Sequence, residues 1–428
     1  PQAGKVVKTE QGVFGSTILT LSNGVRVILK PTDFKADEVR MQAFSPGGTS
    51  LFDDKDVLQF ALISQIASLG GLGNFNAVDL DKVLAGKMAS ASAQVNTLTE
   101  GLSGSCSPKD LETMLQLTYL RFTAPRMDQE AFTSFITRNK AALANQEANP
   151  MTAFSDSITV ALYNHHPRAL SMKADMLDKI DYNKVMELYK DRFADASDFT
   201  FILVGNIDEK TATPLIEEYL GSLPATKRNE HFRDTKMDIR KGMYENNFVK
   251  ELETPKASVL MVYSGDCKYD MKNKLQMSML GQLLNMVYLR TVREDAGGTY
   301  GVSCSGSLSK YPSEEGAFQV YFDTDPNRRE EMVKLINEGI EGFIANGPES
   351  DDLSKVKEYM LKTYKQNQKE NGYWMGILNT YYWENLDMNT GYEEAVNAIT
   401  GDDLKAFAKA FFGQKNEVEV SMSSPVKK

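Results

Sequence analysis

The sequence predicts an α+β protein made of two tandem homologous lobes, each a β-sheet with helices packed on one face. The first observation is an internal repeat: residues 180–204 return from Ile399 onward at a constant offset of 219 positions. A repeat of this period is a whole domain rather than the unit of a solenoid. The second observation is that strands and helices are mixed in each copy, with hairpins instead of regular strand–helix–strand alternation.

The first copy is expected to open with a β-hairpin at Asn23-Gly24. Apolar residues alternate on both sides of this pair, and both residues tolerate the positive φ of a tight turn. A further strand is expected over residues 38–44, ended by Pro46 and two glycines. Helical spacing then predicts one helix, stopped by Gly70. Its apolar positions are Leu58, Leu62, Ile66 and Leu69.

Three amphipathic helices and a strand are expected to complete the first copy. Asn149-Pro150 is predicted to end the second of these helices, because a residue before proline disfavours the α region. The helices are expected over residues 108–122, over residues 128–147 and from Asp181 or Asn183, and the closing strand over residues 199–204.

A charged linker is expected between the copies. The stretch from Leu223 to about Asn247 is dense in Lys, Arg, Asp and Glu, which is typical of a domain boundary. We therefore divide the chain into a first lobe at residues 1–230 and a second lobe at residues 231–428. The elements expected in the second lobe are strands near Phe248 and over residues 257–263, helices over residues 271–293, 328–346, 351–369 and 373–385, and a last helix that opens at Thr400 with Asp403 in a capping-box pattern.

The composition describes an ordinary globular protein and narrows its partners. Hydrophobic residues make up 42% and charged residues 25%, and no apolar run approaches the roughly 18 residues of a membrane span. The net charge is −10 with dispersed basic residues, which argues against nucleic acid as the main partner. The polar start at Pro1 resembles a linker, so we expect the chain to be part of a longer protein.

Few residues of the chain suit metal or nucleophilic chemistry. The three histidines form no H-x-x-E-H or H-E-x-x-H pattern. Two of them are adjacent, and adjacent side chains on an extended segment diverge. The three cysteines are far apart, which fits buried free thiols; a Cys–His nucleophile stays open but has no local signature. These residues are His165, His166, His231, Cys106, Cys267 and Cys304.

The segment 289–302 has the strongest case for binding. A helix is expected to end there at Gly297-Gly298, and a strand leaves with Tyr300 near its start. If Arg293 and Tyr300 point to one side of this junction, their guanidinium and phenol could bind carbonyl oxygens of an extended peptide. The alternative is purely structural, because Arg293 lies in the last helical turn and can interact with the helix dipole.

Several segments resemble the pitrilysin/insulinase-type zinc metallopeptidases, together with mitochondrial processing peptidase. The resemblance covers nearly the whole chain. Its most specific part is Arg293 with Tyr300, which resembles an arginine and a tyrosine, seven positions apart, that the family's non-catalytic half contributes to substrate binding. The other matching segments are the hairpin at residues 21–29, the turn at Gly48-Thr49-Ser50, and the lobe end at residues 204–208 and 220–224.

The chain departs from the family pattern where a catalytic lobe carries its inverted H-x-x-E-H helix. Counted thirteen residues from Gly48, those positions hold Ala61, Ser64 and Gln65. The helix over residues 128–147 would supply a third, carboxylate ligand, but a lone carboxylate does not hold zinc. The resemblance therefore implies that this chain holds no metal and matches the non-catalytic half. The acidic residues of that helix are Asp128, Glu130 and Glu147.

The resemblance also implies a function. This chain would help to enclose and bind peptides that a zinc-bearing partner half hydrolyses, in the same precursor or as a separate subunit. Arg293 would bind the peptide backbone, and Tyr300 would donate a hydrogen bond to the tetrahedral intermediate. The chain alone is expected to be inactive, and a bacterial periplasmic or cell-envelope location is expected. The alternatives are a structural or regulatory subunit, and an independent hydrolase that uses Cys or Ser.

Overall fold

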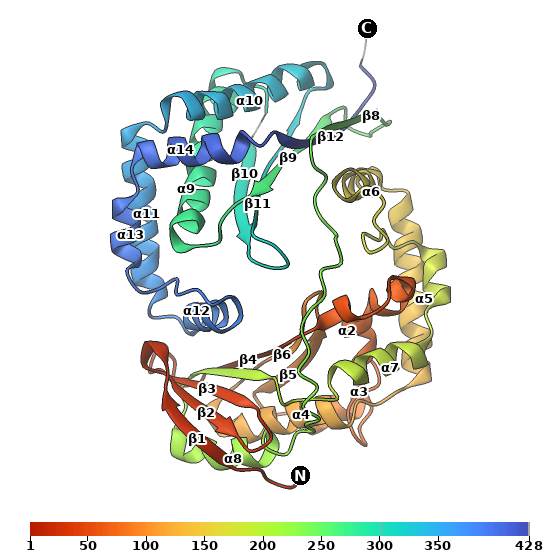
Figure 1. Ribbon diagram of the computed structural model, residues 1–428. Helices are drawn as coiled ribbons and strands as arrows, with labels where there is room; N and C mark the ends of the chain where they lie inside the picture. Colours follow the sequence, from red (N-terminus) through yellow and green to blue (C-terminus); the bar gives the residue numbers. More distant parts are fainter. Residues whose placement is uncertain (300, 427–428) are drawn as a thin grey trace. The chain divides into compact units, whose positions relative to one another are not determined.

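A computed structural model describes residues 1–299 and 301–426 of the chain, which divide into two compact units. Each unit contains one β-sheet with its own helices (Figure 1). Each unit also includes a short segment from the other half of the sequence. Unit 1 consists of residues 1–144, 172–235 and 367–379, and unit 2 of residues 145–171, 236–366 and 380–428.

The sheet of unit 1 has seven strands in the order β1-β2-β3-β7-β4-β6-β5. All neighbours are antiparallel except β3 and β7, which pair in parallel. The last strand of the repeat therefore lies in the middle of the sheet, between β3 and β4. The strands are β1 (Val6–Gln11), β2 (Thr17–Leu21), β3 (Arg26–Pro31), β4 (Val39–Pro46), β5 (Ala89–Val95), β6 (Thr99–Cys106) and β7 (Thr200–Gly205).

The predicted hairpin between β2 and β3 is present, and its turn is tied to the end of the unit. Gly24 has a φ of 94°, and a Cβ atom there would lie 2.9 Å from the carbonyl oxygen of Ser197, so glycine fits best. The Asn23 side-chain amide donates to the carbonyl oxygens of Leu220 and Leu223, at 2.9 and 3.2 Å. The turn thus packs against the chain segment that leaves unit 1.

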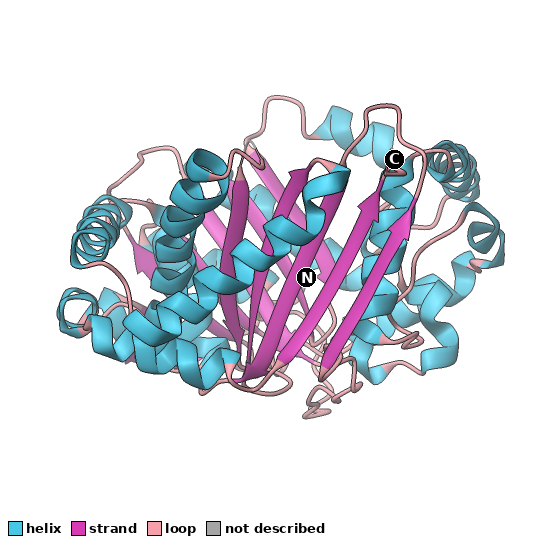
Figure 2. Cartoon of the chain, turned by 90° about the horizontal axis from the view of Figure 1, so that it is seen from above, coloured by secondary structure: helices cyan, strands magenta, loops and turns pink. Residues whose placement is uncertain are grey.

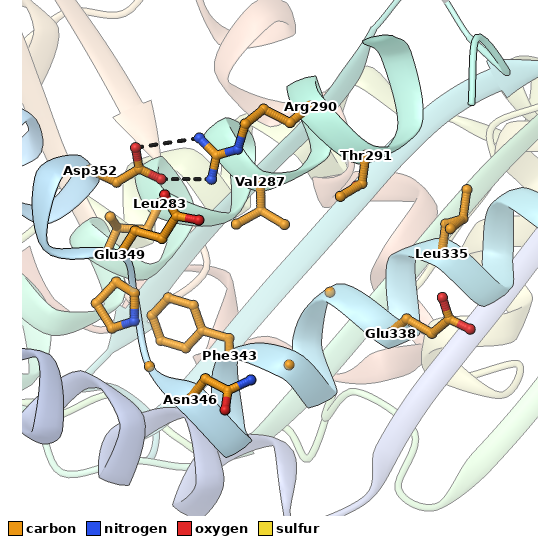
Figure 3. A pocket seen from close by; sticks show the side chains of 14 residues that line it. Leu283, Val287, Arg290, Thr291, Leu335, Glu338, Phe343, Asn346, Glu349 and Asp352 are labelled. Atoms are coloured by element: carbon orange, nitrogen blue, oxygen red, sulfur yellow. Dashed lines mark hydrogen bonds and ion pairs between the residues drawn. The ribbon is translucent and has the colours of Figure 1, made fainter. Parts of the chain in front are cut away.

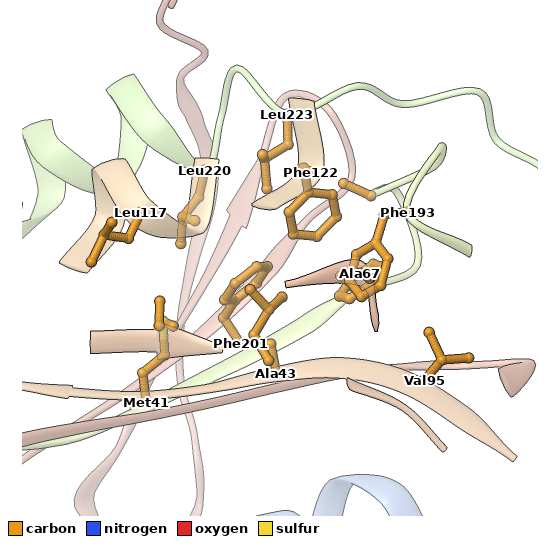
Figure 4. Close-up of a cluster of buried hydrophobic side chains, with 14 of the residues drawn as sticks. Met41, Ala43, Ala67, Val95, Leu117, Phe122, Phe193, Phe201, Leu220 and Leu223 are labelled. Atoms are coloured by element: carbon orange, nitrogen blue, oxygen red, sulfur yellow. The ribbon is translucent and has the colours of Figure 1, made fainter. Parts of the chain in front are cut away.

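Helices cover one face of this sheet and form its core. At the centre, Phe122 packs edge-on against Phe193 and Phe199, with ring centroids 5.2 and 4.9 Å apart (Figure 4). The helices are α1 (Val57–Phe60), α2 (Ile63–Ala67), α3 (Ala77–Val83), α4 (Leu111–Thr123), α5 (Gln129–Glu147), α7 (Tyr182–Arg192) and α8 (Glu209–Tyr219), with the last residues of α5 in unit 2.

The single helix predicted from Leu58 to Leu69 is wrong in one respect. The structure has two short helices, α1 and α2, because the backbone leaves the helical region at Leu62 (φ −118°, ψ 23°). Apolar spacing continues across this break, so the periodicity alone does not reveal it.

The sheet of unit 2 repeats the topology of unit 1 with five strands in the order β10-β11-β9-β12-β8. β8 takes the place of β3, β12 of β7, and β9 of β4. The strand that closes the repeat, β12, again pairs in parallel with the opening strand, β8. Among the described residues, the hairpin strands β1 and β2 lack counterparts in this sheet. The strands are β8 (Met243–Val249), β9 (Ala257–Asp266), β10 (Val302–Ser309), β11 (Glu315–Thr324) and β12 (Asn416–Ser423).

Helices α9, α10 and α14 cover one face of this sheet (Figure 1). Figure 2 shows strands flanked by helices. The capping box predicted at the start of α14 is present: Thr400 Oγ1 accepts from the Asp403 N–H, and the Asp403 carboxylate accepts from the Thr400 N–H. None of the helices in residues 1–299 and 301–426 has the length and apolar character needed to cross a membrane. The helices are α9 (Met271–Tyr288), α10 (Arg329–Asn346), α11 (Ser350–Asn367), α13 (Tyr392–Ala398) and α14 (Gly401–Phe412).

The other face of each sheet carries a helix from the opposite half of the sequence. The first residues of α12 (Asn371–Glu384) belong to unit 1, where Asn371 bonds to the side chains of Thr32 and Glu38. Helix α6 (Pro150–Tyr163) belongs to unit 2 and buries Phe154 and Ala161 against β12. The two helices occupy nearly equivalent repeat positions, so the exchange is reciprocal.

Helix α6 corrects the expectation that Asn149-Pro150 only ends a helix. The Asn149 side chain accepts a hydrogen bond from the Met151 N–H at 2.9 Å, and Pro150 occupies the first helical turn. Asparagine before proline is also an N-terminal signal, because proline suits the first position of a helix. The same pair of residues therefore ends α5 and starts α6.

Replacing Phe122 with alanine should destabilise the protein by about 3–5 kcal/mol, because the buried aromatic cluster cannot close the space. Urea-induced unfolding followed by circular dichroism measures this change. The control is Val78→Ala on α3, where the side chain is 63% exposed and the change should stay within about 0.5 kcal/mol. Equal effects of the two variants would contradict the packing described for unit 1.

Candidate substrate-binding site

The helix that leads to the predicted binding residues ends in a π-helical turn. Helix α9 continues without a break into η6 (Leu289–Asp295), which contains Arg293. π-Helical turns are rare in proteins, and those that occur are often found at functional sites. Arg293 is exposed to solvent, and it forms no ion pair with any residue in the described part of the chain. Its guanidinium is therefore available to an external acceptor.

The backbone beyond this turn is held from behind by α10 and β11. Thr324 Oγ1 donates to the carbonyl oxygen of Gly298 at 2.6 Å, and Arg328 Nη2 donates to that of Ala296 at 2.9 Å. A Cβ atom on Gly298 would lie 2.0 Å from the sulfur of Met332, so a larger residue here would force the Met332 side chain to move. These contacts fix the segment from Arg293 to Gly298.

The structure places only one of the two predicted binding residues. Arg293 lies in η6, as the sequence predicts for the last turn of a helix. Tyr300 lies outside the described residues, so the expected pairing of its phenol with Arg293 stays a prediction. Gly297 has a φ of 60°, consistent with the predicted turn between helix and strand.

A second arginine of the same turn forms an ion pair that sequence reasoning missed. Both oxygens of the Asp352 carboxylate accept from the guanidinium of Arg290, with an Nη2–Oδ2 distance of 2.8 Å (Figure 3). Asp352 lies at the start of α11 and is buried, so the pair ties η6 to that helix. The two residues are 62 positions apart in sequence, and no local pattern signals such a contact.

The Arg290–Asp352 pair borders a cavity of about 360 Å³ on the helical side of unit 2. The side chains of Leu283, Val287 and Phe343 line it with apolar surface (Figure 3). Thr291 Oγ1 is buried at its wall and has no hydrogen-bond partner among the described residues. The cavity leaves room beside η6, so the position of this turn depends strongly on the ion pair.

Of the three positions of the missing metal motif, only Ser64 has a side-chain hydrogen bond among the described residues. Ser64 Oγ accepts a hydrogen bond from the Val95 N–H at 3.0 Å, whereas Ala61 and Gln65 are exposed. Asp128 accepts from the Ala131 N–H at the start of α5. Within residues 1–299 and 301–426, no group of three His, Cys, Asp or Glu side chains could hold a metal ion. The residues present therefore do not fit a zinc site.

The thiols and the adjacent histidines do not form a nucleophilic centre in the described structure. Burial raises the pKa of Cys106 and of Cys304 to about 12, so both stay protonated at neutral pH. Cys267 is only partly buried, unlike the sequence expectation, and its pKa is raised to about 11. His166 Nδ1 accepts from the Arg168 N–H within a loop.

A buried carboxylate holds the turn after β4. Glu100 Oε2 accepts from the Gly48 N–H at 2.7 Å, and its Oε1 lies 3.4 Å from Arg192 Nη1. Gly47 and Gly48 both have positive φ angles, of 144° and 59°. Burial raises the pKa of Glu100 to about 8, and this effect exceeds the opposing influence of the Gly48 N–H and Arg192.

Comparisons with known proteins agree with the fold. The family model described as the peptidase M16 inactive domain matches residues 179–360. A zinc protease PQQL-like protein of Arabidopsis thaliana is 27% identical over 84% of this chain and 37% of its own length. The crystal structure of the periplasmic protease PqqL from Escherichia coli has a TM-score of 0.87 and 21% identity, over 99% of this chain and 47% of that chain.

The first half of that Escherichia coli protein, solved separately, is also similar. It has a TM-score of 0.76 and 15% identity, over 98% of this chain and 94% of the half. The chain spans 37% of the length of the Arabidopsis relative and 47% of the whole PqqL chain.

Replacing Glu100 with glutamine should alter the pH dependence of stability. The pKa of Glu100 is raised on folding, so the folded state binds its proton more tightly than the unfolded state, where the pKa is about 4.3. The contribution of Glu100 to the free energy of unfolding therefore falls as pH rises from about 4.3 to about 8. Glu100→Gln removes this loss, so the variant should gain stability relative to the wild type across that range.

Urea unfolding at a series of pH values measures this gain. The control variant is Glu187→Gln, which alters an exposed carboxylate on α7 of the same unit and should keep the wild-type slope. A Glu100→Gln slope identical to that of the wild type would show that Glu100 is ionised at all these pH values.

Replacing Asp352 with asparagine should loosen η6. The change removes the buried charge that holds Arg290, at a cost of about 1–3 kcal/mol. Amide hydrogen exchange of residues 289–298 should accelerate, because the turn beside the cavity loses its tie to α11. Asp351→Asn is the matched control: Asp351 is the neighbouring residue, and its 79% exposed side chain pairs with Lys355 on the same helix. Unchanged exchange in Asp352→Asn would refute this role of the ion pair.

Proposed function

We propose that this chain belongs to the M16 peptidase family and is of its inactive-domain type. On this basis, it is the non-catalytic half of an insulinase-like zinc metalloendopeptidase. In this proposal the chain helps to enclose and bind peptide substrates. Hydrolysis belongs to a partner half that carries H-x-x-E-H and zinc, either in the same precursor or as a separate subunit.

The observation that carries this proposal is a peptidase-type fold in which the exposed guanidinium of Arg293 can bind a ligand, whereas no set of metal-binding side chains is found among the described residues. The match to the inactive domain includes η6 and Arg293. The described residues offer no group of metal ligands. A fold of this family that lacks metal-binding side chains can contribute to peptide hydrolysis by binding the substrate but not by activating water on a metal.

The two structural similarities support the second-half assignment. The whole PqqL protein matches over 47% of its length with a TM-score of 0.87, whereas its first half alone gives 0.76. The fold of this chain is therefore nearer to the remainder of that protein than to its first half. PqqL is also described as a periplasmic protease, which supports a periplasmic or cell-envelope location for this chain.

In the proposed assembly, Arg293 and Tyr300 act on the peptide. The Arg293 guanidinium, with five N–H donors in a planar fork, binds carbonyl oxygens of an extended backbone. The Tyr300 hydroxyl donates a hydrogen bond to the oxygen on which negative charge develops during hydrolysis. The zinc and the general base that attack the peptide bond are supplied by the partner half.

Tyr300→Phe in the assembled enzyme should lower kcat by about 10²–10³, because one hydrogen bond to the developing oxyanion is lost. Arg293→Ala should mainly raise KM, because the lost contact binds the substrate in the ground state as well. Steady-state cleavage of a peptide by the chain combined with its H-x-x-E-H half measures both. Tyr359→Phe is the control, since Tyr359 is 62% exposed on α11 and should leave both constants unchanged.

Wild-type kinetics for both Tyr300→Phe and Arg293→Ala would favour a structural or regulatory subunit instead. Absence of an H-x-x-E-H sequence from both the precursor and its neighbouring genes would overturn the peptidase proposal altogether. Chelator-resistant cleavage by the chain alone would favour an independent hydrolase.

A further inference from the structure

The two sheets differ at one edge. The opening strand of the repeat pairs with a further strand in unit 1, but its counterpart in unit 2 is an edge strand. In unit 1, the opening strand β3 is followed in the sheet by β2 and β1. In unit 2, its counterpart β8 ends the sheet, and within the described residues it pairs only with β12. One side of β8 therefore presents backbone N–H and C=O groups to the exterior.

Two hydrogen bonds determine which residues of β8 point outward. The Gly242 carbonyl oxygen accepts from the Glu417 N–H at 3.0 Å, and the Lys250 N–H donates to the Ser423 carbonyl oxygen at 2.9 Å. The register between them is continuous, so even-numbered residues face β12. The backbone groups that face outward belong to Met243, Glu245, Asn247 and Val249.

Two of the residues whose backbone groups face outward also have large, exposed apolar side chains. Met243 is 65% exposed and Val249 is 66% exposed, and they lie at opposite ends of the strand. Natural edge strands are usually protected by charges or bulges. The edge strand β1 of unit 1 has such protection, since it carries Lys8 and Glu10 and its register shifts near its start. β8 pairs with β12 in a register without a bulge, and it has a single charge, Glu245.

We propose that β8 pairs with β8 of a second copy of this chain. The strands run antiparallel, and a two-fold axis passes at Asn246. In this register Met243 lies opposite Val249 of the copy, and Glu245 lies opposite Asn247 of the copy. All outward-facing residues then oppose one another, so each pair exchanges both backbone hydrogen bonds. The two sheets of unit 2 become one continuous sheet.

The sequence of β8 favours a second copy because the strand is complementary to itself. Apolar side chains meet at both ends of the pairing, and an amide meets the carboxylate near its centre. On the opposite face of the sheet, Tyr244 lies opposite Phe248 of the copy, which gives an aromatic pair beside α6. An unrelated peptide would need this same pattern, whereas a second copy provides it by symmetry.

The test is the mass of the chain in solution, measured by sedimentation equilibrium over a roughly hundredfold range of concentration. The wild type should form a concentration-dependent dimer. Met243→Lys/Val249→Lys places lysine opposite lysine twice and should weaken association by roughly tenfold or more. Met243→Lys/Val249→Glu places lysine opposite glutamate and should restore it. The two variants differ only in the sign of one charge, so they test the register itself.

Val7→Lys is the control, because Val7 is a 64% exposed residue on the protected edge β1 and should leave the dimer unchanged. Circular dichroism verifies that each variant is folded. A monomeric wild type at every concentration would overturn the proposal. So would equal dimerisation of the two double variants, or dissociation caused by Val7→Lys instead.

Discussion

The architecture depends on one constraint, which is that the last strand of each repeat must enter the middle of its own sheet. β7 lies between β3 and β4, and all six of its residues are buried. β12 occupies the same place between β8 and β9. A sheet without its central strand is two separate pieces, so the beginning and the end of each repeat are held together by hydrogen bonds. The constant offset of 219 residues between the copies reflects two units of this kind.

This constraint also positions Arg293, the described member of the predicted binding pair. Helix α9 packs on the sheet of unit 2 through residues such as Leu280 and Leu284, and the chain then returns to the edge strand β10. η6 continues α9 as far as Asp295, and Arg290 anchors it to Asp352. Arg293 is therefore presented from a turn whose geometry is set by packing behind it. The cavity beside η6 is the part of this support that is incompletely filled.

Local signals in the sequence predicted the elements that local interactions determine. The hairpin at Asn23-Gly24 and the capping box at Thr400 are examples, because each depends on residues within a few positions. The break at Leu62 was not predictable, since it leaves the apolar spacing unchanged. The exchange of α6 and α12 was also missed, because an amphipathic pattern indicates a buried face but not which sheet buries it. The ion pair between Arg290 and Asp352 was also missed, because it joins residues far apart in the sequence.

The reciprocal exchange of α6 and α12 has a consequence for synthesis on the ribosome. Unit 1 has all its strands once β7 has emerged, but its contact with Asn371 must wait for some 166 further residues. At bacterial and eukaryotic elongation rates this delay is roughly ten to thirty seconds. During that interval the polar face of the first sheet, with Glu38 and Gln42, is open to solvent. The nascent first repeat thus reaches its final form only together with the second.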